Sequence, residues 1–163
     1  MDQSVHPSSL SMRWRVDVCK EIPEDLWKAC DRASAFFKSK YIVSSGGVAD
    51  KFESLKVPDI DVRDYILRLI FYLGMSESQF LLAIEYIDRY MLARRVGLTE
   101  KTMHRLAGIA MVLAHKFDSD FPFSDSHYAR VTGMHREELM MLQMEFLLII
   151  GYRLMYPQVL RRI

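Results

Sequence analysis

The chain has 163 residues, half of them apolar, and a formal net charge of +1. This length fits one domain with a sizeable buried core. The even charge balance argues against a protein that works mainly by gripping phosphate backbones or anionic membranes.

Two cysteines, Cys19 and Cys30, cannot staple a domain of this size, so we expect a reducing compartment. The opening segment MDQSVHPSSLSMRWR lacks the apolar stretch of a secretory signal. No uncharged apolar run reaches the roughly 18–20 residues of a membrane span. We therefore expect no membrane partner and a cytoplasmic and/or nuclear location.

The N-terminal part is predicted to hold a tail, one helix and a linker. Residues 1–22 form a polar tail, and Pro23 suits a first helical position. Apolar residues then recur at helical spacing over 24–41, which predicts an outer helix. The Ser-Ser-Gly-Gly stretch at 44–47 breaks the pattern. The helix and its linker together occupy 23–57.

Five further helices are expected between residues 58 and 155, and no segment has the alternation of a strand. Each begins at a capping type of residue or at His, and glycine marks three of the ends. Ser76 and Gln79 have the spacing of a capping box, and Glu138 stands at the box position after His135. The predicted limits are Asp59 or Asp61 to Gly74, Ser76 to about Tyr90, Thr99 to about Phe117, Ser124 to Gly133, and His135 to about Ile150.

The third of these helices is predicted to be the hub of the fold. Between Arg105 and His115 it carries nine uncharged residues, LAGIAMVLA. A helix that is apolar on all sides must be surrounded by others, and this one is too short to span a membrane. The stretch 139–150 is nearly as apolar, with Gln143 and Glu145 as its only polar residues.

No residue pattern indicates catalysis. Gly46 and Gly47 lack the Lys-Ser/Thr of a phosphate-binding loop. Asp118, Asp120, Asp125 and His127 are compatible with a weak metal site or with a solvated loop with capping residues, and we favour the loop. We expect no enzyme activity, no cofactor and no small-molecule substrate.

The C-terminal methionines allow two interpretations. A group of flexible thioether side chains suits an adaptable binding groove, but at helical spacing such residues are more typical of core. We favour the core for this group, which consists of Met134, Met140, Met141 and Met144.

Three strings carry a family resemblance: FLLAIEYIDRYM at 80–91, LTEKTMHRLAGIAMVLAHKFDSDFPFSDSHYARVTGM at 98–134, and EELMMLQMEFLLIIGYRL at 137–154. Their Tyr-Ile-Asp-Arg, Ala-x-Lys-Phe and Tyr-Ala-Arg-Val-x-Gly motifs resemble the cyclin box, and more narrowly that of the PHO-type (P/U-type) cyclins. The resemblance covers about 58–155. It implies an all-α fold, a single five-helix cyclin box with an extra N-terminal helix packed outside it, leaving 156–163 as a C-terminal tail.

The resemblance also implies a function. Cyclins are regulatory subunits that bind a cyclin-dependent protein kinase and activate it by docking on its αC helix. The docked helix turns so that its Glu reaches the kinase's own strand Lys. In energetic terms the cyclin binds the active kinase better than the inactive one and shifts the population.

Cyclins place a Lys near the end of the third box helix and a Glu in the fifth against the kinase. Lys116 matches the Lys, although a helix C-terminus favours a Lys in any case. The Glu position falls on Gln143, where this chain departs from the family, and Glu145 is the weaker candidate. Two residues lie about 200° apart around a helix, so only one of the two can help Lys116. Apolar contact positions, each equally compatible with ordinary core, are matched by Phe117, Leu147, Tyr152 and Leu154.

Two residues are expected to brace the box. In cyclins the Asp of Tyr-Ile-Asp-Arg pairs internally with a basic residue of the first box helix. Asp88 is therefore expected to be structural, with Arg63 as its candidate partner. The Met-Arg-Ala-Ile-Leu helix that cell-cycle cyclins use to recruit substrates is not visible, because 61–67 read DVRDYIL.

A second hypothesis is a cyclin-box adaptor of the transcription-factor type that binds nucleic acid or peptide without a kinase. It predicts a basic stripe. The basic doublets after the first helix are Arg94-Arg95 and Arg161-Arg162, and each is short. We therefore favour a cyclin-dependent kinase over nucleic acid as the partner. A purely structural bundle does not account for the ordered motifs.

Overall fold

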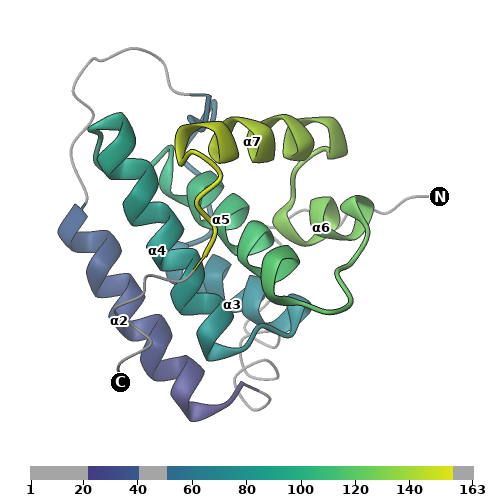
Figure 1. Cartoon of the computed structure of the whole chain (residues 1–163). Helices are drawn as coiled ribbons and strands as arrows, with labels where there is room; N and C mark the ends of the chain where they lie inside the picture. Colours follow the sequence, from purple (N-terminus) through teal and green to yellow (C-terminus); the bar gives the residue numbers. More distant parts are fainter. Residues whose placement is uncertain (1–21, 41–50, 156–163) are drawn as a thin grey trace.

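A computed structural model describes residues 22–40 and 51–155 (Figure 1). The predicted tail, Ile22 apart, the break at 44–47 and the segment 156–163 lie outside these ranges. The helices are α2 (Glu24–Lys40), α3 (Val62–Leu73), α4 (Glu77–Arg94), α5 (Met103–Asp118), α6 (Asp125–Thr132) and α7 (Arg136–Ile149).

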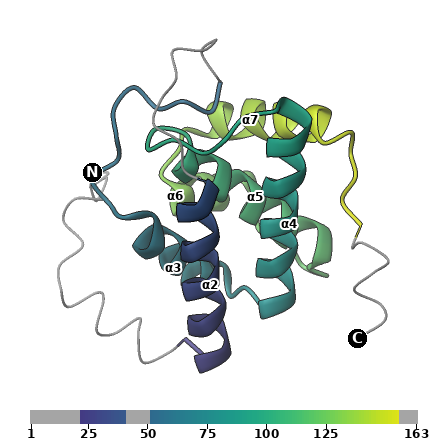
Figure 2. The same cartoon turned by 90° about the vertical axis from the view of Figure 1, so that its left-hand side faces the viewer.

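The described ranges contain helices and no strand, which confirms the predicted all-α fold. The five helices predicted between 58 and 155 correspond to α3 to α7, and α2 is the extra helix packed outside them (Figure 2). None of these helices has both the length and the apolarity of a membrane span.

Most helix ends fall at the predicted signals. The Asp61 side chain accepts the N–H of Arg63 at the start of α3, and Gly74 ends that helix at φ +60°, a conformation that glycine adopts without strain. At α4 both bonds of the capping box between Ser76 and Gln79 are present.

Two predicted caps are wrong. Thr99 does not cap α5, because the helix follows Thr102 and the Thr99 hydroxyl lies 3.1 Å from the Thr102 hydroxyl in the preceding turn. The helix begins one turn later than expected. Glu138 does not close a box with His135, since its carboxylate pairs with Arg105 on α5 at 2.5 Å.

Helix α5 is the hub, as predicted, and α3, α4 and α7 pack on it. Every residue from Leu106 to His115 is buried. The backbones of α5 and α3 approach closely because Gly108 has no side chain: a Cβ there would lie 2.8 Å from the Tyr65 hydroxyl oxygen. That hydroxyl donates a hydrogen bond to the Thr132 carbonyl at 2.8 Å, which ties α3 to the end of α6.

Helix α2 packs its apolar side against α3 and α4. Arg63 of α3 donates to Asp31 of α2 at 2.8 Å, and its guanidinium lies over the Trp27 ring at 5.1 Å. The predicted Arg63–Asp88 pair is therefore wrong. Asp88 lies half-buried on α4, and Arg63 fastens the outer helix instead.

The linker before α3 contributes a core residue that its sequence does not signal. Phe52 is fully buried and packs edge-on against Tyr90 of α4 at 5.2 Å and Phe146 of α7 at 6.0 Å. The preceding Lys51 forms an ion pair with Glu145 of α7 at 3.1 Å. This part of the linker is thus fastened beneath α7.

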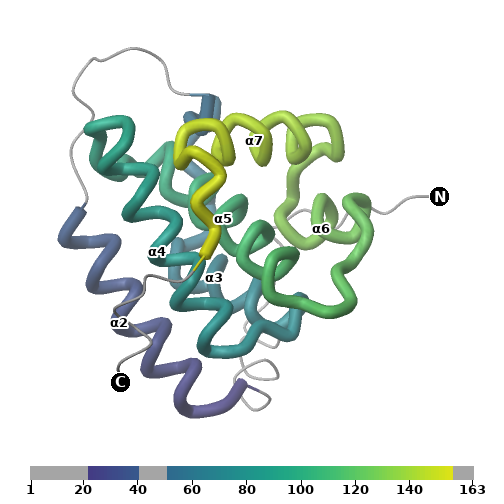
Figure 3. Tube along the Cα trace, in the orientation of Figure 1, coloured from purple at the N-terminus to yellow at the C-terminus, as the bar shows by residue number. Residues whose placement is uncertain are grey.

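The segment after α7 returns alongside α4 (Figure 3). Tyr86 donates its hydroxyl proton to the Leu154 carbonyl at 2.6 Å. Arg89 donates to the carbonyl oxygens of Arg153 and Met155. Helix α4 therefore fixes the backbone of three consecutive residues beyond the last helix.

Candidate functional site

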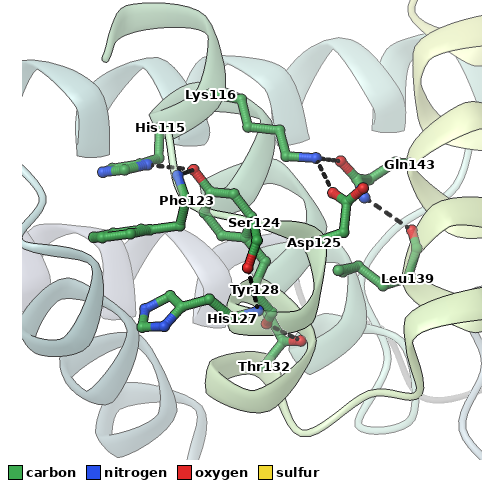
Figure 4. A network of polar contacts seen from close by, with 10 residues as sticks. All are labelled: His115, Lys116, Phe123, Ser124, Asp125, His127, Tyr128, Thr132, Leu139 and Gln143. Carbon is green, nitrogen blue, oxygen red and sulfur yellow. Dashed lines mark hydrogen bonds and ion pairs between the residues drawn. The ribbon is translucent and has the colours of Figure 1, made fainter. Parts of the chain in front are cut away.

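The ammonium group of Lys116 is the point where three helices meet (Figure 4). Lys116 lies in the last turn of α5, and its Nζ donates to Asp125 Oδ1 of α6 at 2.6 Å and to Gln143 Oε1 of α7 at 2.9 Å. The same atom lies over the Tyr128 ring at 5.1 Å. An ammonium has three N–H donors, and these two hydrogen bonds use two of them. The Lys116 side chain is 29 % exposed, which leaves it open to a partner.

Of the two candidate residues on α7, the structure brings Gln143 to Lys116. Gln143 is buried, and its amide nitrogen donates to the Leu139 carbonyl at 3.3 Å, which directs its oxygen toward the ammonium. Glu145 points to the other side of α7, where it pairs with Lys51.

A buried aromatic and imidazole cluster supports Lys116 from below. The Tyr128 oxygen accepts the N–H of Phe123 at 3.2 Å and lies 2.7 Å from His115 Nδ1. The hydroxyl proton remains available for donation to Nδ1 of a neutral imidazole. Burial lowers the pKa of His115, in agreement with the neutral form. This cluster holds the start of α6, and with it Asp125, against α5.

The predicted apolar contact residues divide into two kinds. Phe117 and Tyr152 are exposed large side chains. Leu147 and Leu154 are half-buried and pack partly against the core. Phe117 follows Lys116 directly, and Leu147 lies one helical turn beyond Gln143 on α7.

Helix α7 carries an exposed apolar surface that the sequence interpretation missed. Its core side is Leu139, Leu142 and Phe146, while Met140, Met144 and Leu148 recur every fourth residue on the exposed side. The preference for a core position is wrong for three of the four methionines, because Met140, Met141 and Met144 are exposed and Met134 alone packs against the core. We call the set of Met140, Met144, Leu147 and Leu148 the α7 apolar face.

The acidic cluster after α5 has no metal-like geometry. In the described part of the chain, no group of three or more His, Cys, Asp or Glu side chains is arranged to hold a metal ion. Asp118 and Asp120 are exposed, and Asp125 is occupied by Lys116.

A hollow of about 260 Å³ lies at the opposite end of α5, between α3 and the turn that joins α6 to α7. His104 Nε2 is 2.6 Å from the Ile60 carbonyl, so it carries the proton and leaves Nδ1 as an acceptor. Among the described residues, neither that buried Nδ1 nor the buried Nε of Arg68 has a hydrogen-bond partner. Both residues line the hollow together with Ile60, Tyr65 and Met134.

Comparisons with known proteins identify the family of this chain. A family model described as Cyclin matches residues 23–154, a range that includes α2 and crosses the boundary predicted at 57–58. Cyclin-U2-2 of Arabidopsis thaliana is 31 % identical over 113 residues, which cover 68 % of this chain and 48 % of the relative. Cyclin-P3-1 of Oryza sativa subsp. japonica is 32 % identical over 120 residues, or 72 % of this chain and 51 % of the relative. Cyclin-U3-1 of Arabidopsis thaliana is 32 % identical over 115 residues, or 71 % of this chain and 52 % of the relative.

The chain spans about half the length of these relatives. The matched range contains all six described helices and the residues around Lys116. The chain therefore belongs to the cyclin family, and its similarity to U- and P-type cyclins identifies it as a cyclin-box protein of the P/U type.

Proposed function

We propose that this chain binds a cyclin-dependent protein kinase and activates it by docking on the kinase αC helix. Membership of the cyclin family supports a regulatory role rather than a catalytic one. The observation that carries the proposal is the contact between Lys116 and Gln143 at 2.9 Å, where the end of α5 and the middle of α7 form one polar group.

The surroundings of that polar group suit a protein partner. Phe117 and Tyr152 are exposed, and the α7 apolar face begins within one turn of Gln143. Stable interfaces combine an apolar centre that excludes water with a few well-placed polar contacts. A helix laid across this surface would cover the apolar side chains and receive a hydrogen bond from the remaining N–H of Lys116.

Activation requires that the cyclin bind the active conformation of the kinase more tightly than the inactive conformation. To reverse a population from 1:99 to 99:1, the cyclin must bind the active state with roughly 5.5 kcal/mol more affinity. A handful of buried anchors can supply that difference, since individual hot-spot residues contribute about 2 kcal/mol or more.

The first test replaces Lys116. Each purified cyclin-dependent kinase of the source organism is titrated calorimetrically with wild type, Lys116→Glu and Lys116→Met, and its activity is assayed on a peptide substrate. We expect loss of binding and of activation for both variants. Lys51→Glu is the control, because it removes another cation but lies beneath the opposite side of α7. Normal binding by folded Lys116→Glu would reject this docking surface.

A matched pair on α7 tests the orientation. Gln143→Ala and Glu145→Ala each remove one polar side chain from the same helix, but only the first contacts Lys116. We expect the first to weaken kinase binding more. The reverse order would move the contact to the other side of α7.

The hollow at the far end of α5 favours a second function, the docking of a peptide segment from a protein substrate. The unpartnered acceptor on His104 and the unpartnered donor on Arg68 lie buried beneath the lining of the hollow, so a peptide backbone would reach them only if a lining side chain moved. Ile60, Tyr65 and Met134 provide apolar contacts for a side chain.

Met134→Glu tests this function in the kinase complex. We expect a higher KM for a full-length protein substrate and an unchanged rate on a short peptide that spans only the phosphorylated site. Equal effects on both substrates, or on neither, would contradict docking in the hollow.

A further inference from the structure

The charge balance at Lys116 differs from the one that the family resemblance implies. The position on the last helix that holds a Glu in cyclins is occupied here by Gln143, which is neutral. A partly buried ammonium with only a neutral partner is poorly compensated. In this chain a carboxylate nevertheless lies 2.6 Å from the ammonium, and it comes from α6.

We propose that Asp125 is a positioning residue of the docking surface and supplies, from α6, the negative charge that cyclins carry on the last helix. The inference rests on the proposed function, since it assigns a role within the same surface. The Lys116 ammonium is shared between one carboxylate and one amide, which together fix the direction of its third N–H.

The fold holds Asp125 in place. It is the first residue of α6, directly after Ser124, whose side chain accepts the N–H of His127 at 3.3 Å. One turn later Tyr128 is fully buried and tied to His115 and to the backbone of Phe123. Figure 4 shows the Asp125 carboxylate pointing from α6 toward the ammonium, beside the Gln143 oxygen.

The relocated charge predicts a property of the partner. Asp125 is still 31 % exposed, so its carboxylate faces both Lys116 and whatever covers the surface. The acidic side of the polar group lies on α6 and the neutral amide on α7. A kinase with a cationic side chain or an unpaired N–H opposite α6 is therefore favoured over one with that group opposite α7.

A series of variants that moves the carboxylate from α6 to α7 tests the proposal. Kinase affinity is measured for Asp125→Asn, Gln143→Glu and the double variant. We expect Asp125→Asn to weaken binding about tenfold, as for loss of a charge-assisted hydrogen bond. The double variant should recover most of that loss, because it returns a carboxylate to the same ammonium from α7. A merely structural defect in α6 would not be repaired from another helix.

Two controls isolate the cause. Asp118→Asn removes an exposed carboxylate from the same end of α5 and changes the net charge by the same amount as Asp125→Asn. We expect the kinase affinity of this variant to match that of wild type, because the change of net charge alone is unimportant. A double-mutant cycle of Lys116→Met with Asp125→Asn, measured by urea unfolding of the chain alone, should show coupling between the two residues.

The outcomes separate the inference from the proposed function. Two results overturn the role of Asp125: normal binding by Asp125→Asn, or a double variant that binds no better than Asp125→Asn. If Lys116→Glu is defective in the same assay, the docking surface itself stays intact. Normal binding by Lys116→Glu overturns both. Absence of coupling in the unfolding cycle overturns the charge pairing without any kinase.

Discussion

Helices α5 and α7 have nearly the same apolar character in the sequence but different surroundings in the fold. Helix α5 is covered by α3, α4 and α7, and Met111 in its middle is 1 % exposed. Helix α7 lies across the end of the bundle, and Met144 on its outer side is 61 % exposed.

The difference shows how to separate core from interface in a sequence of this kind. A central helix needs apolar residues on every side, because every side meets another helix. A peripheral helix needs them on one side only, so additional apolar residues on α7 exceed what the core requires. Exposed apolar residues beyond those that the core requires, next to a polar group such as Lys116 with Gln143, are typical of a protein-binding surface.

The same substitution on both helices gives the largest contrast. Met111→Gln removes a buried apolar side chain and buries an amide among apolar neighbours, so we expect the free energy of unfolding to fall by about 3 kcal/mol. Met144→Gln changes an exposed position and should stay within about 0.5 kcal/mol of wild type. Urea unfolding followed by circular dichroism measures both, and equal losses would contradict the assignment of α7's outer side to solvent.

Close packing around α5 gives a smaller effect. An alanine at position 108 would place its Cβ 2.8 Å from the Tyr65 hydroxyl, so Gly108→Ala should destabilise the fold by about 1 kcal/mol despite the better helix propensity of alanine. In a Tyr65→Phe background the clashing atom is gone, and the same change should cost less. Additive losses in the two backgrounds would show that this contact does not limit the approach of α3 to α5.

The smallest effect is a dependence of stability on pH that originates in α5. Burial lowers the pKa of His104 and of His115 below the ordinary value of 6.5. Each then binds fewer protons in the folded chain than in the unfolded chain. Their contribution to stability is complete above about pH 6.5 and is lost as the pH falls through the folded-state pKa.

We therefore expect the melting temperature to fall between about pH 7.5 and about pH 5.5. The decrease should be smaller in a His104→Gln/His115→Gln variant, even if that variant is less stable throughout. Residues 136–149 of α7 contain no histidine, so variants of its apolar face should keep the wild-type slope. An unchanged slope in the double-histidine variant would contradict the burial argument.

Much of the fold follows from local signals in the sequence. The six helices, the central position of α5 and the capping box at Ser76 depend on spacing and capping chemistry, which neighbouring residues determine. Phe52 was not predicted, because a single aromatic residue in a linker carries no periodicity. The Arg63–Asp88 pair that the family resemblance implies is wrong, because Arg63 pairs with Asp31 of α2, and no local pattern specifies how α2 docks on the box.

The site was predictable in part for the same reason. Helical geometry separates Gln143 from Glu145 and directs only one of them to Lys116. The contribution of Asp125 depends on how a short helix is placed by the buried Tyr128 and His115, which is a tertiary property.

The most direct test of the docking surface is a methyl NMR titration of the methionine-labelled chain with the kinase identified by calorimetry. We predict that the Met140 and Met144 signals shift or broaden. The signal of Met111 in the core and that of Met134 beside the far hollow should stay unchanged. Perturbation of Met134 with unaltered Met140 and Met144 would contradict the account, since the kinase would then bind at the other end of α5.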